Sequence, residues 1–135
     1  MLKLIYGPKG FGKTKIILDD VNAAAEKANG NVVFITDKKF DSVNVNFKVR
    51  CIYTEEYGVD SIEKLEGFIY GLIAGNSDIE CVFIDGISRI TNAAPAQLED
   101  VMKELEQLGA NGVNFEITVS AAKEDLPKFM LKYID

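Results

Sequence analysis

The sequence contains no histidine and no tryptophan, and it has only two cysteines and two arginines. Without histidine, the chain lacks the side chain that proteins use most often as a general base near neutral pH and as a zinc ligand. Histidine-dependent catalysis and histidine-ligated zinc are therefore excluded. Cys51 and Cys81 both lie in apolar runs. This placement favours reduced thiols inside a cytoplasmic protein over a disulfide or a metal site.

Positive charge is also scarce. Lysine and arginine number 15 against 21 aspartates and glutamates, which gives a net charge of −6. Proteins dedicated to nucleic acids usually present a basic face, often with aromatic residues between the cations. The lysines here are dispersed along the chain. We therefore expect that this chain does not bind nucleic acid by itself.

Long hydrophobic runs are absent too, because the apolar runs are of strand length and too short to cross a bilayer. The first of them starts at residue 2, so we expect neither a signal peptide nor a membrane segment. The chain has 135 residues and is 47% hydrophobic. Such a chain can bury roughly two-thirds of its unfolded surface in one core. We expect a single soluble domain over residues 1–135.

Apolar periodicity predicts strands that alternate with helices. We expect strands at residues 2–6, 32–35, 43–53, 81–84 and 115–119. Helices are expected after residue 12, from Asp60 or Ser61, from Pro95, and over a short terminal stretch from Asp125. Residues 43–51 alternate apolar and polar side chains, which is typical of a half-exposed strand at a sheet edge. The order predicts a three-layer α/β/α sandwich with a mostly parallel, five-stranded sheet.

Residues 7–14 match the phosphate-binding pattern G-x-x-x-x-G-K-[ST] completely. An apolar strand precedes them and a helical pattern follows, so that backbone amides would converge on a phosphate at a helix N-terminus. In such a loop Lys13 reaches the β- and γ-phosphate oxygens, and Thr14 offers its hydroxyl to Mg²⁺. The residues expected to bind a nucleoside triphosphate are Gly7, Pro8, Lys9, Gly10, Phe11, Gly12, Lys13, Thr14 and Lys15.

An aspartate, Asp85, follows the apolar run at 81–84. Mg²⁺ keeps several of its waters, and a carboxylate at a strand end can hold those waters opposite Thr14. The alternative is an aspartate that only caps a helix or a turn. Ligands of parallel α/β sheets bind at the carboxyl ends of strands. The loop at 7–14 and four polar residues follow strands and should gather at one edge, namely Asp37, Glu55, Asp85 and Ser120.

These motifs resemble Walker A and Walker B of the P-loop NTPases, within them the RecA/KaiC-like branch that carries an additional strand. Residues 82–90 are similar to the Walker B region of that branch, and residues 117–120 to its next strand. The resemblance implies the P-loop NTPase fold, with the 115–119 strand inserted between the 2–6 and 81–84 strands. It also implies that Ser120 senses the γ-phosphate. It favours ATP over GTP, as does the lack of an Asn-Lys-x-Asp sequence.

The catalytic groups that the resemblance implies are harder to find. That branch usually carries a glutamate after the strand that follows the first helix, and here only Asp37 is available, one methylene shorter. Glu55 or Glu56 could orient water if their strand adjoins the 81–84 strand. The alternative is that all three acids are exposed loop residues. Arg50 and Arg89 are the only arginines. Arg89 can face the ligand, a neighbouring subunit or solvent.

Three functions remain open. The first is an ATP-binding domain with slow Mg²⁺-dependent hydrolysis, which acts as a switch or as one subunit of a homo-oligomer or larger assembly that supplies an arginine. The second is a non-catalytic nucleotide-binding or interaction module. A small-molecule kinase is less favoured, because its lid or acceptor pocket usually contains several arginines. The catalytic candidates are Lys13, Asp37, Glu55 and Ser120, and the metal candidates are Thr14 and Asp85.

Overall fold

The computed structural model describes residues 1–37, 39 and 44–134. Within them, five strands form one sheet in the order β1-β5-β4-β2-β3. All neighbouring strands of this sheet run parallel. The strands are β1 (Leu2–Gly7), β2 (Asn31–Thr36), β3 (Arg50–Tyr53), β4 (Ile79–Ile84) and β5 (Asn114–Ser120). In a sheet of this kind, the carboxyl ends of all strands lie along the same edge.

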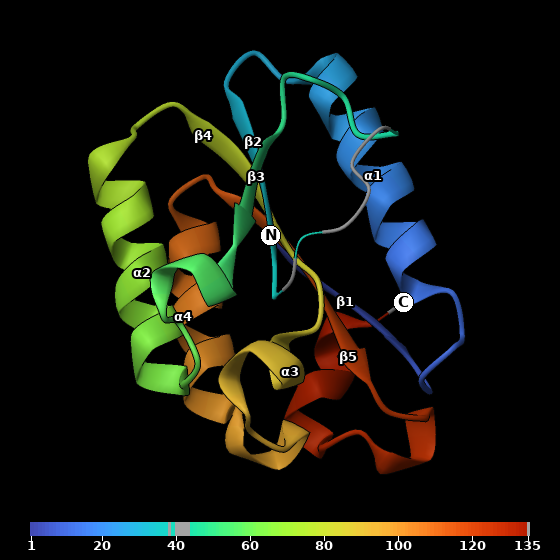
Figure 1. Cartoon of the computed structure of the whole chain (residues 1–135). Coiled ribbons are helices and arrows are strands. Elements are labelled where there is room, and N and C mark those ends of the chain that lie inside the picture. The colour runs from blue at the N-terminus through green and yellow to red at the C-terminus, as the bar shows by residue number, and fades with distance from the viewer. Residues whose placement is uncertain (38, 40–43, 135) are drawn as a thin grey trace.

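Helices connect the strands and cover both faces of the sheet. They are α1 (Lys13–Lys27), α2 (Ile62–Gly75), α3 (Ile87–Thr91) and α4 (Glu99–Ala110), with the 3₁₀ helices η1 (Thr54–Tyr57), η2 (Pro95–Gln97), η3 (Lys123–Asp125) and η4 (Lys128–Tyr133). Figure 1 shows α1 on one side of the sheet and α2 with α4 on the other. The chain is therefore an α/β protein with helices on both faces of a parallel sheet.

The core is divided between these two faces. Successive residues of a strand point to opposite faces, so Phe34 of β2 packs in the cluster of α1, which includes Ile17. The next residue, Ile35, packs in the cluster that contains Leu65 of α2 and Leu105 of α4. Near-continuous apolar strands are what a sheet buried on both faces requires.

Several sequence predictions are confirmed. The described strands include all five predicted ones, and β5 lies between β1 and β4 as the resemblance implies. Helix α2 begins after Ser61, whose hydroxyl accepts a hydrogen bond from the Lys64 amide at 3.2 Å. It ends at Gly75, with Asn76 as its C-cap. The short strand β3 lies at the sheet edge, as its half-polar pattern predicts.

The predicted length of this edge strand is wrong. Residues 44–49 form turns and bends, and β3 spans only Arg50–Tyr53; Val43 lies outside the described residues. Two asparagines explain the difference. The Asn46 amide donates to Oδ1 of Asn22 in α1 at 2.8 Å, and Oδ1 of Asn46 accepts from the Lys48 amide at 2.9 Å. Asparagine side chains that bond to nearby backbone favour turns over strands.

Two predicted helices also differ from the structure. Pro95 starts the 3₁₀ helix η2, and α4 begins only at Glu99. The Gln97 side chain accepts from the Ala94 amide at 2.8 Å, which closes the earlier turn. The stretch from Asp125 forms no α-helix. It contains the end of η3 and then η4, with Pro127 between them. Proline has no amide hydrogen to continue the first helix into the second.

Both cysteines are free and partly buried. Burial is the main cause that raises the pKa of the Cys51 and Cys81 thiols above their ordinary value. Neither thiol therefore has the low pKa of a nucleophilic cysteine. In the described part of the chain, no helix combines the length and the apolar character that crossing a membrane demands.

Candidate functional site

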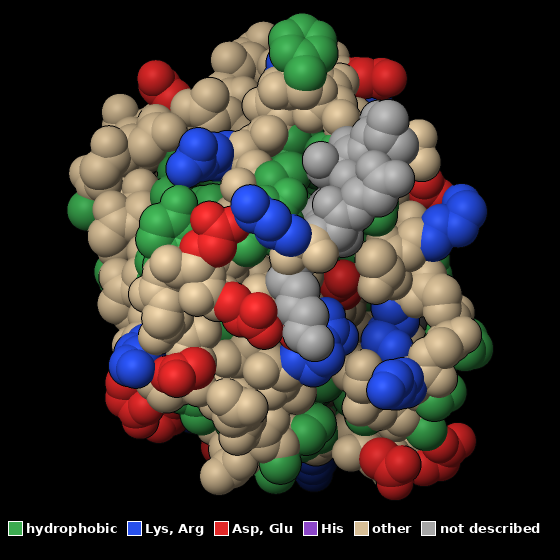
Figure 2. Space-filling view, viewed as in Figure 1, with side chains coloured by type: hydrophobic (Ala, Val, Ile, Leu, Met, Phe, Trp, Pro, Cys, Tyr) green, Lys and Arg blue, Asp and Glu red, His purple; other side chains and the backbone are tan. Residues whose placement is uncertain are grey.

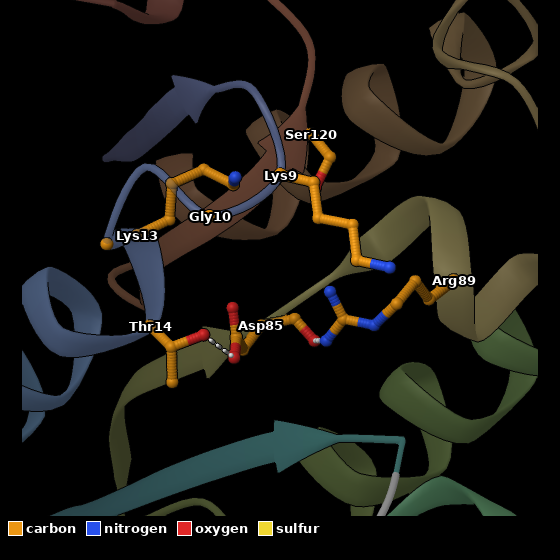
Figure 3. A pocket seen from close by; sticks show the side chains of 8 residues that line it. Lys9, Gly10, Lys13, Thr14, Asp85, Arg89 and Ser120 are labelled. Atoms are coloured by element: carbon orange, nitrogen blue, oxygen red, sulfur yellow. Dashed lines mark hydrogen bonds between the residues drawn. The ribbon is translucent and has the colours of Figure 1, made fainter.

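A cleft of about 340 Å³ opens at the carboxyl edge of the sheet. Its described lining residues are Lys9, Gly10, Gly12, Lys13, Thr14, Asp85, Arg89 and Ser120. Figure 3 shows the loop before α1 on one side of the cleft and Arg89 reaching in from α3 on the other. The structure thus brings together the loop at 7–14, Asp85 and Ser120, which the sequence analysis placed at one edge.

The loop turns sharply into α1 at Gly12. This residue is the N-cap of the helix and has a φ of 86°, a left-handed conformation that residues with a Cβ adopt only with strain. Inside the loop the Phe11 amide donates to the Pro8 carbonyl at 3.1 Å. At the start of the helix the Ile16 amide donates to the Gly12 carbonyl at 3.2 Å. The amides of the first helical turn before Ile16 have no intrahelical acceptor, so the N-terminus of α1 offers donors for an anion.

Lys13 places a cation within this loop. The residue is only 7% exposed, and its Nζ donates to the Pro8 carbonyl at 2.9 Å. Burial lowers the pKa of Lys13, the negative charge of Asp85 opposes that effect, and the positive charge of Arg89 adds to it. An anion in the cleft would be attracted by Lys13 and would in turn favour its charged form.

Asp85 is held from three sides. It is 4% exposed, and its Oδ2 accepts from the Thr14 hydroxyl at 3.0 Å. Its Oδ1 accepts from the Thr118 hydroxyl at 2.7 Å, and its amide donates to the Ile35 carbonyl at 2.8 Å. Since β4 lies between β2 and β5, β2 holds the backbone of Asp85, while Thr118 of β5 and Thr14 of α1 hold its carboxylate.

The carboxylate and the Thr14 hydroxyl are hard oxygen ligands beside a phosphate-type loop. Mg²⁺ in nucleotide sites is commonly bound by one or two carboxylates together with phosphates and water. The described residues contain no group of three or more acidic, cysteine or histidine side chains that could form a complete protein cage for a metal. Thr14 and Asp85, whose side chains lie 3.0 Å apart, are the described residues that could hold Mg²⁺ carried with a phosphate ligand.

Sequence reasoning missed Thr118 as a site residue. Its hydroxyl donates to Asp85 and also accepts from the Gly86 amide at 2.8 Å. The residue is 1% exposed in the middle of the apolar strand β5. A threonine between buried apolar residues, two positions before the strand end, was the available signal, because buried hydroxyls need hydrogen-bond partners.

Arg89 pairs with Asp37 across the end of the sheet. The distance from Nε to Oδ2 is 3.2 Å and that from Nη2 to Oδ1 is 3.3 Å, while Nη2 also donates to the Asp85 carbonyl at 3.5 Å. Burial by itself would raise the pKa of Asp37, but the hydrogen bond and charge of Arg89 outweigh it, so that the pKa lies below its ordinary value. The residues of the described chain that line the cleft include Arg89 but not Asp37.

Glu55 and Glu56 lie in η1, after β3. Strand β3 pairs with β2 rather than with β4, so the adjacency that would bring these acids to the cleft is not present. The Glu55 amide donates to the Asp37 carbonyl at 3.2 Å, and the Glu56 carboxylate lies 3.6 Å from Lys39. Neither acid is among the described residues that line the cleft.

Some of the loop residues predicted to bind nucleotide line the cleft, and others do not. Lys15 turns to Asp19 on the surface of α1, with Nζ 2.9 Å from Oδ2, and does not belong to the described lining. Phe11 is 63% exposed at the tip of the loop, and its ring packs over Gly7. Pro8 contributes its carbonyl to Lys13. The loop residues that face the cleft are Lys9, Gly10, Gly12, Lys13 and Thr14.

The cleft is locally positive in an acidic chain. Its described lining holds three cationic side chains, Lys9, Lys13 and Arg89, and one carboxylate, Asp85, although the net charge is −6. Figure 3 shows Lys9 and Arg89 extending toward each other. The face shown in Figure 2 carries both acidic and basic side chains. A concave site in which several positive charges lie close together favours an anionic ligand.

Compared with known proteins, the chain matches no protein-family model and no curated protein sequence.

Proposed function

We propose that the protein binds a nucleoside triphosphate, ATP by preference, together with Mg²⁺, and hydrolyses it slowly. The observation that carries this proposal is the 3.0 Å contact between the Thr14 hydroxyl at the start of α1 and the buried Asp85 carboxylate after β4. This contact joins a glycine-rich loop at a helix N-terminus to a strand-end carboxylate. Phosphate and magnesium recognition require these two parts next to each other.

Each part has a separate role in binding. The amides at the N-terminus of α1 and the Lys13 ammonium hold the phosphates. Thr14 and Asp85 hold Mg²⁺, which supplies charge neutralisation at the β- and γ-phosphates when bound. Ser120, at the end of β5 and in the cleft lining, senses the terminal phosphate. Thr118 keeps the Asp85 carboxylate in place through its hydroxyl.

The sheet order supports the P-loop NTPase fold for this chain, and within it the RecA/KaiC-like branch. Strand β5 lies between β1, which leads into the loop, and β4, which leads to Asp85. This is the position that the resemblance to that branch implies for its additional strand.

Turnover is expected to be slow because few groups are free to act on water. Asp37 is one methylene shorter than the usual glutamate and is paired with Arg89 unless a ligand takes that arginine, and Glu55 lies outside the described cleft lining. A positioned transition-state arginine can raise phosphoryl-transfer rates by several powers of ten. We propose that the protein works as a nucleotide switch or as one subunit of a larger assembly, with a protein partner or further copies of itself.

The same pairing of Asp37 favours a second candidate, a nucleotide-binding module without hydrolysis. In that case the phosphate loop and Asp85 act as described, and nothing orients water. A small-molecule kinase has less support, because Arg89 is the single arginine in the described lining and acceptor pockets usually contain more.

The experiment that tests the proposal measures binding and turnover on the same samples. Calorimetric titration with ATP and with GTP, with and without Mg²⁺, is compared for wild type, Lys13→Ala and the matched control Lys15→Ala. Loss of a charge-assisted hydrogen bond should weaken ATP binding about 10- to 100-fold in Lys13→Ala. Lys15→Ala should bind like wild type, because Lys15 pairs with Asp19 outside the cleft.

Phosphate release then separates the two candidates. Slow release in wild type that disappears in Lys13→Ala supports an NTPase. Binding without release supports the non-catalytic module. If neither ATP nor GTP binds to wild type in the presence of Mg²⁺, the proposed function is wrong.

A further inference from the structure

Arg89 stands between the cleft and Asp37. Arg89 belongs to the described cleft lining. Its guanidinium makes both of its ion-pair contacts with Asp37, and Asp37 is not part of that lining. Figure 3 shows Arg89 approaching from the side opposite Lys13 and Thr14. A terminal phosphate that extends from the loop across the cleft would therefore meet Arg89.

The position of the guanidinium depends on Gly86. A Cβ at this residue would lie 2.3 Å from Cζ of Arg89, so the side chain packs directly on a backbone that carries no side chain. Nη2 also reaches the Asp85 carbonyl at 3.5 Å. The guanidinium is thus held beside the aspartate that the proposed function assigns to Mg²⁺.

The pair with Asp37 can be exchanged at low cost. The Arg89 side chain is 48% exposed and that of Asp37 17%, and ion pairs with so much solvent contact contribute little stability. The guanidinium fork fits phosphate oxygens as well as carboxylate oxygens. A terminal phosphate carries more negative charge than one carboxylate and would enter a cleft where Lys9 and Lys13 already attract it.

We propose that Arg89 is the residue by which the site distinguishes a nucleoside triphosphate from a diphosphate, by exchanging Asp37 for the terminal phosphate. This inference rests on the proposed function. A diphosphate held by the loop does not extend to Arg89, which then stays with Asp37. A triphosphate takes the guanidinium and leaves the Asp37 carboxylate without its partner.

The exchange gives Asp37 two states. Paired with Arg89, its oxygens are occupied and its pKa is low. Released, the carboxylate can accept a hydrogen bond from water, and its pKa rises because the arginine charge has moved away. Asp37 would then be available to orient water only when a terminal phosphate is present, which links the attacking group to the correct ligand.

The test compares a non-hydrolysable β,γ-imido triphosphate with ADP, both with Mg²⁺, by calorimetric titration. The variants are Arg89→Gln and Asp37→Asn, with Arg50→Gln as the matched control, because Arg50 is an exposed arginine on β3. Arg89→Gln should weaken binding of the imido analogue about 10- to 100-fold and leave ADP within about twofold. Asp37→Asn removes the competitor and should tighten the analogue by up to about fivefold, with ADP unchanged.

A second variant guards against misfolding of the first. Arg89→Lys keeps the charge but not the fork, and it should lose part of the preference for the triphosphate. Equal effects of Arg89→Gln on both nucleotides, no effect on either, or weaker analogue binding in Asp37→Asn would each overturn the inference. If Lys13→Ala weakens binding of both nucleotides in these cases, the proposed function stands although the inference fails. If wild type binds neither nucleotide, the function fails and the inference fails with it.

Discussion

The hydroxyl of Thr118 connects the Asp85 carboxylate to the backbone of Gly86. It donates to Oδ1 of Asp85 at 2.7 Å and accepts from the Gly86 amide at 2.8 Å. A hydroxyl has one hydrogen to donate and lone pairs to accept, so this one is used in both senses. With Thr14 on Oδ2, the carboxylate is fixed at both oxygens, and its direction is set before any ligand arrives.

Thr118→Val should therefore affect both stability and metal binding. Valine has nearly the same shape but leaves a buried amide and a buried carboxylate oxygen without this partner, which costs about 1–3 kcal/mol of unfolding free energy. Urea unfolding measures the stability. Thr118→Ser keeps the hydroxyl and is the control for shape. If valine and serine destabilise the protein equally, the hydrogen bonds are not the reason.

Asp85→Asn should remove the dependence of nucleotide binding on Mg²⁺. The amide is close in shape, but a neutral oxygen is a much poorer ligand for a hard cation. We expect the increase in ATP affinity on adding Mg²⁺ to be lost, while binding without Mg²⁺ changes little. Titration with and without EDTA checks this. Asp78→Asn, at an exposed aspartate outside the cleft, should behave as wild type, and an unchanged Mg²⁺ effect in Asp85→Asn would exclude this aspartate from the metal site.

Gly67→Ala and Gly71→Ala should stabilise the protein. Both glycines are exposed in the interior of α2, and an added Cβ would meet nothing within 4 Å. Alanine is favoured over glycine in a helix by about 1 kcal/mol. Gly12→Ala also has open space around its Cβ, but its left-handed φ of 86° should make it destabilising by about 1–2 kcal/mol. The urea midpoint should therefore lie above the wild-type value for Gly67→Ala and Gly71→Ala, and below it for Gly12→Ala.

Stability should fall as the pH rises from about 4.5 to 7. A hydrogen bond to Glu104 is the first cause that raises the pKa of Glu66 to about 7, followed by burial and by the charges of Glu104, Glu63 and Asp100. In that range the folded state holds more protons at Glu66 than the unfolded state, so raising the pH favours unfolding. Glu66→Gln should flatten this dependence in urea unfolding at pH 5 and pH 8.

The matched control for this effect is Glu26→Gln, at an exposed position on α1. It should keep the pH dependence of wild type. If Glu66→Gln and Glu26→Gln show the same slope, the carboxyl pair between α2 and α4 is not its source.

Most of the fold could be predicted because its strands are short apolar runs with clear turn signals between them. The errors have local causes. Alternation at 45–49 indicates a strand, but Phe47 is 91% exposed in a turn that Asn22 fastens to α1, and that contact between distant residues is not visible in a periodicity. Helix α3 was missed because five residues are too few to show a 3.6-residue repeat.

Part of the site could be predicted from the sequence and part could not. The loop at 7–14, which is continuous in the sequence, and the strand-end position of Asp85 could be predicted from pattern alone. The pairs Arg89–Asp37 and Thr118–Asp85 could not, because they depend on which strands are neighbours. Only when β4 is known to lie between β2 and β5 does the end of β2 come close to α3, and the interior of β5 close to Asp85.

The sheet order has a consequence for how the protein is made. Strand β1 has β5 as its only neighbour in the described sheet, and β5 follows the other four described strands in the sequence. Until residues 114–120 are synthesised, β1 has no strand to pair with, and the loop at 7–14 is held near Asp85 only through the packing of α1 on β2 and β4. Contacts between residues so far apart in the sequence form slowly. Full nucleotide binding would thus begin only once β5 has paired with β1, and a bound nucleotide would protect nascent chains that contain β5 more than shorter ones.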